Sequence, residues 1–139
     1  MSGVAFVDSS ILIYAHDRDA GPRRDRARRL CEQLRRESSG CLSVQVLQES
    51  YVTVTRKLRT PVARAQAQEL VRTYASWVAS PTTPVTVTRA TELSEAAEIG
   101  FWHALIVPAA EQSGAETLYS EDLNDGQVIA GVRVVNPLR

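Results

Sequence analysis

The stretch Val4–Val7 constrains the fold most, because it is apolar at every position and is followed directly by an acidic residue, Asp8. A continuous apolar run of this length is typical of a strand buried on both faces of a parallel sheet, whereas a half-exposed strand alternates apolar and polar residues. Such a sheet needs helices on both of its faces. We therefore expect an α/β protein with Asp8 at the edge where its first strand ends.

Helix and strand patterns alternate along the rest of the chain. We predict further strands at residues 41–43, 85–87, 116–119 and 132–135, and helices near residues 11–15, 22–37, 44–58, 61–78, 89–99 and 101–112. Thr60–Pro61 is predicted to start the fourth helix and Gly100 to end the fifth. Pro108 should kink or restart the last helix, because proline removes a backbone hydrogen bond. The chain has no linker or repeat, so residues 1–139 are expected to form a single domain.

The composition predicts a protein of the cytoplasm. Apolar residues make up 44% of the chain and charged residues 23%, as in ordinary globular proteins, and no apolar run is long enough to cross a membrane. The first residues lack the pattern of a signal peptide. Cys31 and Cys41 form no CxxC pair, and we expect both to be reduced thiols. His16 is expected at the surface near a helix C-terminus, where its cationic form is favoured.

The second predicted helix is rich in arginine. Its Arg24, Arg28 and Arg35 fall near one face, which is one way to bind an RNA backbone. Acidic residues are interspersed along the same helix, which equally indicates a solvated, ion-paired surface. The formal net charge of the chain is zero, so no global charge attracts nucleic acid. Both interpretations of this helix remain open at this point.

Acidic residues follow several of the predicted strands. Asp8 comes directly after the first strand and Asp122 just after the fourth, with Asp125 on the same loop, while Glu49 lies in the helix after the second strand. Sites in open α/β sheets form beyond the carboxyl ends of the strands, so these carboxylates are expected to converge. Like charges in one pocket raise each other's pKa, and Mg²⁺ or Mn²⁺ relieves that repulsion. Alternatively, Asp8 is a helix cap, Glu49 a solvated helical residue, and Asp122 and Asp125 turn formers.

Three segments resemble one known family. Residues 7–15 (VDSSILIYA) resemble the opening motif of PIN-domain ribonucleases of the VapC toxin type. Residues 118–127 (LYSEDLNDGQ), continuing into residues 132–137 (VRVVNP), resemble the C-terminal signature of that family. Residues 101–106 (FWHALI) are similar to its central helix motif. The similarity covers essentially the whole chain.

The resemblance implies a three-layer α/β/α sandwich with a five-stranded, mainly parallel sheet in the order 3-2-1-4-5. It also implies a homodimer that cleaves RNA endonucleolytically with Mg²⁺ or Mn²⁺, and that is held inactive by a VapB-like antitoxin whose C-terminal segment enters the acidic groove. The residues that the resemblance assigns to the site are Asp8, Glu49 and Asp122 as metal ligands, Asp125 as a helper, and Ser10 and Ser120 as supports of the ligands.

His103 departs from the family motif, which has an aspartate at this position. The change either inactivates the site, or replaces the carboxylate with an altered metal preference, or is compensated by Glu98, Glu121 or Asp125. Imidazole suits Zn²⁺ or Mn²⁺ better than Mg²⁺. We favour an endoribonuclease with reduced activity; the alternative is a non-catalytic module that binds its antitoxin. A phosphatase is a weaker hypothesis, because the chain has no glycine-rich phosphate loop.

Overall fold

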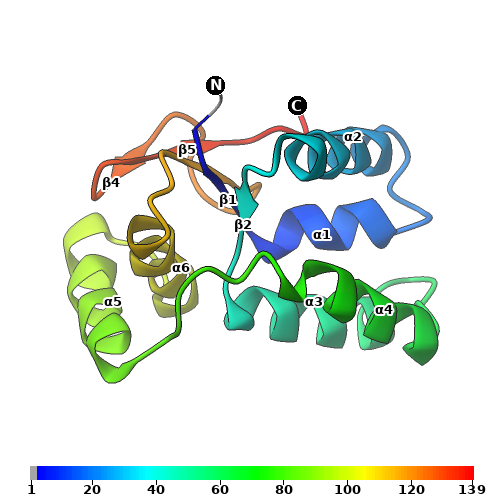
Figure 1. Cartoon of the computed structure of the whole chain (residues 1–139), viewed down its shortest axis with the longest axis horizontal. Helices are drawn as coiled ribbons and strands as arrows, with labels where there is room; N and C mark the ends of the chain where they lie inside the picture. The colour runs from blue at the N-terminus through cyan, green and yellow to red at the C-terminus, as the bar shows by residue number, and fades with distance from the viewer. Residues whose placement is uncertain (1–2) are drawn as a thin grey trace.

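The computed structural model of the chain describes residues 3–139 and is built on a five-stranded sheet (Figure 1). The sheet order is β2-β1-β3-β5-β4, and all neighbours are parallel except β4, which is antiparallel to β5. The strands are β1 (Ala5–Val7), β2 (Gly40–Cys41), β3 (Thr117–Tyr119), β4 (Val128–Ile129) and β5 (Val132–Val135). Phe6 and Val7 in β1 have no exposed surface, which confirms the prediction of a strand buried on both faces.

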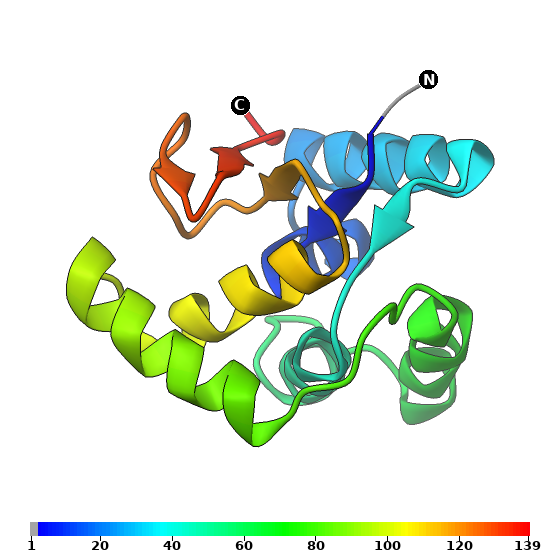
Figure 2. The ribbon, with the colours of Figure 1, turned by 60° about the vertical axis from the view of Figure 1, so that its left-hand side comes forward.

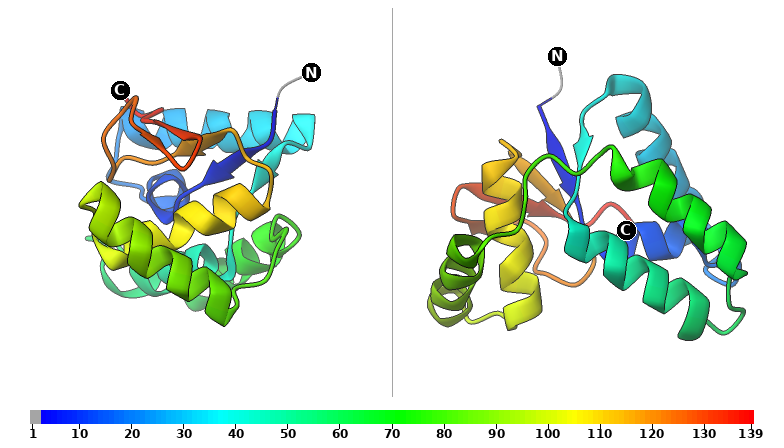
Figure 3. Two further views of the ribbon diagram at one scale, coloured as in Figure 1. Left: turned by 90° about the vertical axis from the view of Figure 1, so that its left-hand side faces the viewer. Right: turned by 60° about the horizontal axis from the view of Figure 1, so that its bottom comes forward.

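Six helices pack around this sheet in the described part of the chain. They are α1 (Ser9–His16), α2 (Pro22–Glu37), α3 (Val44–Arg56), α4 (Arg64–Ala75), α5 (Pro84–Ala97) and α6 (Phe101–Gln112). Helices α2 and α6 lie on opposite sides of the sheet, α5 packs outside α6, and α3 and α4 form a hairpin beside α1 (Figures 2 and 3). The expected α/β architecture, with a mainly parallel sheet between helices, is confirmed.

The third predicted strand is wrong, because residues 85–87 lie in the first turn of α5. Pro84 occupies the first position of this helix, and Thr83 and Thr86 form a capping box with their side chains and backbone amides. Thr86, Ala90 and Leu93 then place a buried face at helical spacing. Capping and burial therefore override the β propensity of this short segment.

The predicted strand order holds for four strands. Strands two, one, four and five of the prediction correspond to β2, β1, β3 and β5, which are neighbours in that order. Beyond β2, Leu42 forms an isolated parallel bridge with Val78 in the position expected for the third strand. The antiparallel strand β4 at the opposite edge was not predicted.

Two predicted helix ends are also wrong. Helix α4 begins at Arg64, capped by extended Ala63, and not at Pro61. Helix α5 ends at Ala97 and its C-cap Glu98 adopts a left-handed conformation with φ 55°, whereas Gly100 is the N-cap of α6. Residues with positive φ are rarely other than glycine, so the sequence pattern favoured Gly100 as the helix end.

Pro108 neither ends nor restarts α6, which continues as one helix to Gln112. Proline removes one backbone hydrogen bond from a helix interior. Here every residue from 104 to 110 is buried, and α6 packs against both α5 and β5. Tertiary packing therefore keeps the helix continuous, as it does for most helices in globular proteins.

His16 is half-buried, not the exposed and readily charged residue that the sequence suggested. Its Nδ1 lies 2.8 Å from the carbonyl oxygen of Leu12. Burial lowers the pKa of His16, and the nearby charges of Arg28 and Arg24 lower it further. The neutral ring is therefore favoured, because desolvation and like charge outweigh the helix terminus.

The cysteines bear out the expectation of reduced thiols. Cys31 and Cys41 are free and buried, and burial raises the pKa of each thiol to about 11. Neither forms a reactive thiolate at neutral pH.

Across residues 3–139, none of the helices combines the length and the apolar character required to span a bilayer.

Gly40 gives the first testable prediction. A Cβ atom at this position would overlap the ring of Trp77, which itself packs edge-to-face on Tyr74. We expect Gly40→Ala to lower the free energy of unfolding by about 1–3 kcal/mol, the usual effect of overpacking. Urea denaturation of a double-mutant cycle with Trp77→Leu measures this clash directly. An equal effect of Gly40→Ala in both backgrounds would contradict the explanation.

Candidate metal centre

Asp8 is the buried centre of the acidic site. It ends β1 and caps α1, with 2% of its surface exposed. Its Oδ1 accepts a hydrogen bond from the Ser9 amide at 2.7 Å, and its Oδ2 accepts one from the Ser120 hydroxyl at 2.7 Å. Burial is the main reason why the pKa of Asp8 lies above its ordinary value, and the charge of Asp122 adds to the rise. Asp8 is therefore the helix cap that the sequence offered as an alternative, and its role as a site residue stays a prediction.

Ser120 and Ser10 connect the segment after β3 to the start of α1 through their hydroxyl groups. The Ser120 oxygen donates to Asp8 and also accepts a hydrogen bond from the Asp122 amide at 3.1 Å. Ser10 Oγ accepts a hydrogen bond from the Glu121 amide at 3.2 Å. The two serines thus position the loop that carries Asp122, and their role as supports of metal ligands stays a prediction.

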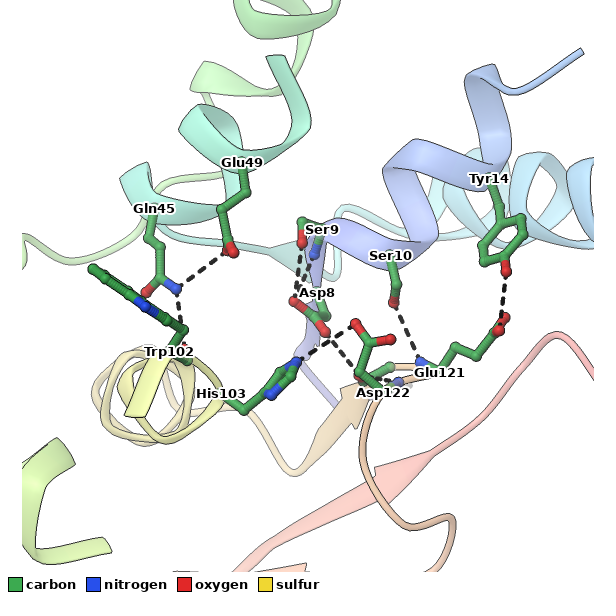
Figure 4. A network of polar contacts seen from close by, with 11 residues as sticks. Asp8, Ser9, Ser10, Tyr14, Gln45, Glu49, Trp102, His103, Glu121 and Asp122 are labelled. Atoms are coloured by element: carbon green, nitrogen blue, oxygen red, sulfur yellow. Dashed lines mark hydrogen bonds and ion pairs between the residues drawn. The ribbon is translucent and has the colours of Figure 1, made fainter. Parts of the chain in front are cut away.

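His103 projects from the first turn of α6 toward the carboxylates (Figure 4). Its Nε2 lies 3.6 Å from Asp122 Oδ2, which is an ion-pair contact and slightly long for a hydrogen bond. Asp122 is the main cause of the raised pKa of His103; burial opposes the rise, and Asp8 contributes to it. One ligand atom each from Asp8, His103 and Asp122 lie within 4.8 Å of one another.

Glu49 approaches the same cluster from α3. Its Oε1 accepts a hydrogen bond at 3.2 Å from the side-chain Nε2 of Gln45. The same nitrogen donates to the backbone carbonyl of Trp102 at 3.0 Å. Burial raises the pKa of Glu49, and the charge of Asp8 is the second cause. Glu49 lies outside the tightest group of ligand atoms but within the electrostatic range of all three of its members.

Gln45 is a residue that the sequence analysis missed. It is buried and precedes Glu49 by four residues, so both side chains lie on one face of α3. Its contact with Trp102 joins α3 to α6, which is the helix of His103. The spacing of four residues was the available signal, but the contact with α6 depends on the tertiary fold.

Asp125 does not join the cluster. Its Oδ1 accepts a hydrogen bond from the Asn136 amide at 2.8 Å, and its Oδ2 lies 3.7 Å from Arg139. The carboxylate therefore fastens its loop to the C-terminal segment. The geometry gives no support to the expected role of Asp125 as a helper of the metal ligands.

The other acids considered as substitutes for the missing carboxylate are also engaged elsewhere. Glu121 accepts a hydrogen bond at 3.0 Å from the hydroxyl of Tyr14 (Figure 4). Glu98 is the exposed C-cap of α5. Neither is among the three residues whose ligand atoms converge, so His103 alone occupies that place in the cluster.

The donor set fits a divalent cation. The carboxyl groups of Asp8 and Glu49 both have raised pKa values, caused by burial and by negative neighbours, so a positive charge in their midst would stabilise the ionised site. Two carboxylates and one imidazole converge, and a third carboxylate lies nearby. Mn²⁺ accepts both oxygen and nitrogen ligands, whereas Mg²⁺ prefers oxygen.

Comparisons with known proteins agree with this fold. The family model described as "PIN domain" matches residues 5–125. VapC20 of Mycobacterium tuberculosis, a toxin that cleaves the sarcin-ricin loop, is 21% identical with a TM-score of 0.64, over 85% of this chain and 89% of that one. VapBC2 of Rickettsia felis, solved on a DNA fragment from its promoter, is 19% identical with a TM-score of 0.63, over 94% and 96% of the two chains. No curated protein sequence matches significantly.

The burial of Asp8 predicts that Asp8→Asn stabilises the metal-free protein at neutral pH. The folded protein holds this proton to higher pH than the unfolded chain, whose Asp8 has the ordinary pKa of 3.8. Protonated Asp8 therefore adds to the free energy of unfolding at pH values below 3.8. This contribution is lost as the pH rises through the higher pKa that Asp8 has in the folded protein. The variant lacks this loss, so its advantage in urea midpoint should grow from acid to neutral pH.

The control for this prediction is Asp25→Asn, which removes an exposed carboxylate from α2. Measurements in EDTA isolate the effect of Asp8, and asparagine preserves the helix cap. A variant that is less stable than the parent at neutral pH would show that the Asp8 charge is already well compensated in the metal-free protein.

Proposed function

The chain belongs to the PIN-domain family, and from that premise we propose that it is a VapC-like toxin, a metal-dependent RNA endonuclease with activity reduced by His103. The observation that carries the proposal is the convergence of Asp8, His103 and Asp122 within 4.8 Å, with Glu49 beside them. The similar fold of VapC20, whose described activity is cleavage of the sarcin-ricin loop, supports RNA as the substrate class.

In this proposal Asp8, Glu49 and Asp122 would hold the cation. A bound Mg²⁺ or Mn²⁺ would supply an activated water and offset charge on the scissile phosphate, a chemistry that would leave a 5′-phosphate and a 3′-hydroxyl. Ser120 orients Asp8 by its hydrogen bond at 2.7 Å, and Gln45 orients Glu49 at 3.2 Å. The residues of the chain thus preorganise the negative charge to which the cation is drawn.

His103 reduces activity for an electrostatic reason. A neutral imidazole supplies no negative charge, and a protonated one competes with the cation for Asp122, from which its Nε2 is 3.6 Å away. The raised pKa of His103 increases the protonated fraction near neutral pH. A neutral His103 also offers a nitrogen donor, so we propose a preference for Mn²⁺ over Mg²⁺.

A non-catalytic module is the alternative function. The buried contacts of Asp8 and Ser120 would then preserve only the shape of the site, and the protein would bind its antitoxin without cleaving RNA. The observation that favours this alternative is the pairing of His103 with Asp122, which supplies a positive charge without any metal. Cleavage of RNA by the unmodified chain separates the two functions.

We propose a VapB-like antitoxin and a second copy of the chain as partners in the cytoplasm. The similarity to the chain in the VapBC2 complex supports the antitoxin. The antitoxin would place an arginine near the carboxylates, where a guanidinium offsets the same negative charge that a cation does.

Restoring the family carboxylate tests the proposed function. We expect His103→Asp to raise Mn²⁺-dependent and Mg²⁺-dependent RNA cleavage at least about tenfold, because one added carboxylate strengthens the charge that binds the cation. The double variant Asp8→Asn/His103→Asp is the control and should be inactive. Calorimetry of Mn²⁺ and Mg²⁺ on the same proteins separates binding from turnover. Metal binding without cleavage in both the parent and His103→Asp would favour the non-catalytic module.

Ser120 provides a prediction about the support of the ligands. Ser120→Ala removes the hydrogen bond to Asp8 and leaves the Asp122 amide without its partner. We expect Mn²⁺ affinity to fall about 10-fold to 100-fold, the usual range for residues that orient metal ligands. Ser113→Ala is a matched control, since it removes a serine hydroxyl that bonds to the Ala109 carbonyl near the end of α6. Equal affinity in the parent and Ser120→Ala would exclude this orienting role.

A further inference from the structure

A second site lies at the end of α1 opposite the acidic centre. Asp8 caps the start of α1 and His16 ends it, so the two ends of this eight-residue helix are separated by about 12 Å. A cavity of about 760 Å³ lies at the His16 end. It is bordered by α1, by the first turns of α2 and by α4 with the loop before it, elements that lie together in Figure 1. The proposed cleavage reaction uses no residue of this cavity.

The cavity is lined by three guanidinium groups, from Arg18, Arg24 and Arg28. Glu69 is the acidic residue of the lining, and its carboxylate pairs with Arg72 at 2.7 Å. No carboxylate among residues 3–139 forms an ion pair with any of the three cavity arginines. The cavity therefore concentrates positive charge in a chain whose formal net charge is zero.

Arg24 carries a buried hydrogen-bond donor that no residue from 3 to 139 satisfies. Its Nε is buried and has no hydrogen-bond partner among the described residues. Most buried polar groups are hydrogen-bonded, and a buried donor without an acceptor destabilises the folded protein. A ligand with acceptor atoms, bound in the cavity, would remove this penalty.

Arg28 and His16 are held in place by backbone carbonyls. Arg28 donates from Nε to the Ala15 carbonyl at 2.8 Å, which leaves its two terminal nitrogens for a ligand. His16 lines the same cavity, and its Nδ1 lies 2.8 Å from the Leu12 carbonyl. A fixed donor such as the Arg28 guanidinium loses little conformational freedom when a ligand binds.

We propose that this cavity is a phosphate-binding site, with Arg18, Arg24 and Arg28 as the groups that hold the phosphate. Guanidinium groups bind phosphate through paired hydrogen bonds. Three guanidinium groups offer more hydrogen-bond donors and more positive charge than one carboxylate can pair with. A phosphate group has more acceptor oxygens than a carboxylate and therefore matches them better. The volume exceeds that of an inorganic ion and suits a nucleotide or a short piece of RNA backbone.

The ligand has two possible sources that share this chemistry, a free nucleotide and the backbone of RNA. The site is independent of the proposed metal centre, so binding is measured in EDTA, where no cleavage occurs. The probes are inorganic phosphate, adenosine 5′-monophosphate and a single-stranded RNA hexanucleotide, titrated calorimetrically at neutral pH and about 50 mM salt, because phosphate contacts weaken as salt rises.

We expect each probe that binds the parent protein to bind the Arg24→Gln variant at least about tenfold more weakly. This is the effect of losing one charged hydrogen bond. Arg18→Gln, at an exposed position, should weaken binding in the same direction and serves if Arg24→Gln does not fold. Arg36→Gln is the matched control, since it removes the same charge from the far end of α2, outside the cavity lining. Its affinities should equal those of the parent.

The outcomes separate the sources of phosphate. Competition between the hexanucleotide and adenosine 5′-monophosphate indicates RNA backbone, whereas binding of the mononucleotide alone indicates a free nucleotide. The proposal is overturned if neither inorganic phosphate nor the nucleotide binds, or if both arginine variants bind them as the parent does. It is also overturned if a glutamate-rich peptide binds the cavity and phosphate does not, which would indicate an acidic protein segment as the occupant.

Discussion

The hydrogen bond between Ser120 and Asp8 is the interaction on which the rest of the site depends. It joins the ends of β1 and β3, which are neighbours at the centre of the sheet, and it holds a carboxylate that is almost completely buried. Ser120 also accepts the Asp122 amide, so one hydroxyl sets the positions of two acids. The backbone of Asp8 donates in turn to the Tyr119 carbonyl, which fixes the edge where both strands end.

The negative charge at this edge is the central physical constraint of the molecule. The raised pKa values of Asp8 and Glu49 show that burial and mutual repulsion both oppose their ionisation. A nearby positive charge stabilises the ionised carboxylates. Either a divalent cation or the protonated ring of His103 can supply that charge. An aspartate at position 103 would offer only the first solution. The histidine allows both, because its ring either pairs with Asp122 when protonated or, when neutral, leaves the carboxylates to a cation.

The sequence predicted the parts of the site that follow from local order along the chain. Asp8 and Asp122 were expected at the ends of neighbouring strands because parallel strands end at one sheet edge, and their contacts with Ser120 agree. Glu49 had only a weak local signal, its place in the helix after the second strand, which the family resemblance strengthened. Gln45 was missed since its role requires α6 beside α3. Residues 85–87 were assigned wrongly, because a capping box and a buried helical face outweighed β-branched composition.

The separation of charge along α1 has a structural cause as well as a proposed function. A helix dipole favours negative groups at its N-terminus, where Asp8 lies, and positive groups at its C-terminus, where Arg28 donates to the Ala15 carbonyl. Charge sign alone therefore does not identify either end as a binding site. The basic end is distinguished by the cavity lined by Arg18, Arg24 and Arg28, together with the buried Arg24 Nε, which has no hydrogen-bond partner among residues 3–139. The helix dipole does not require this donor, so the partner that we propose for it is a bound ligand with acceptor atoms.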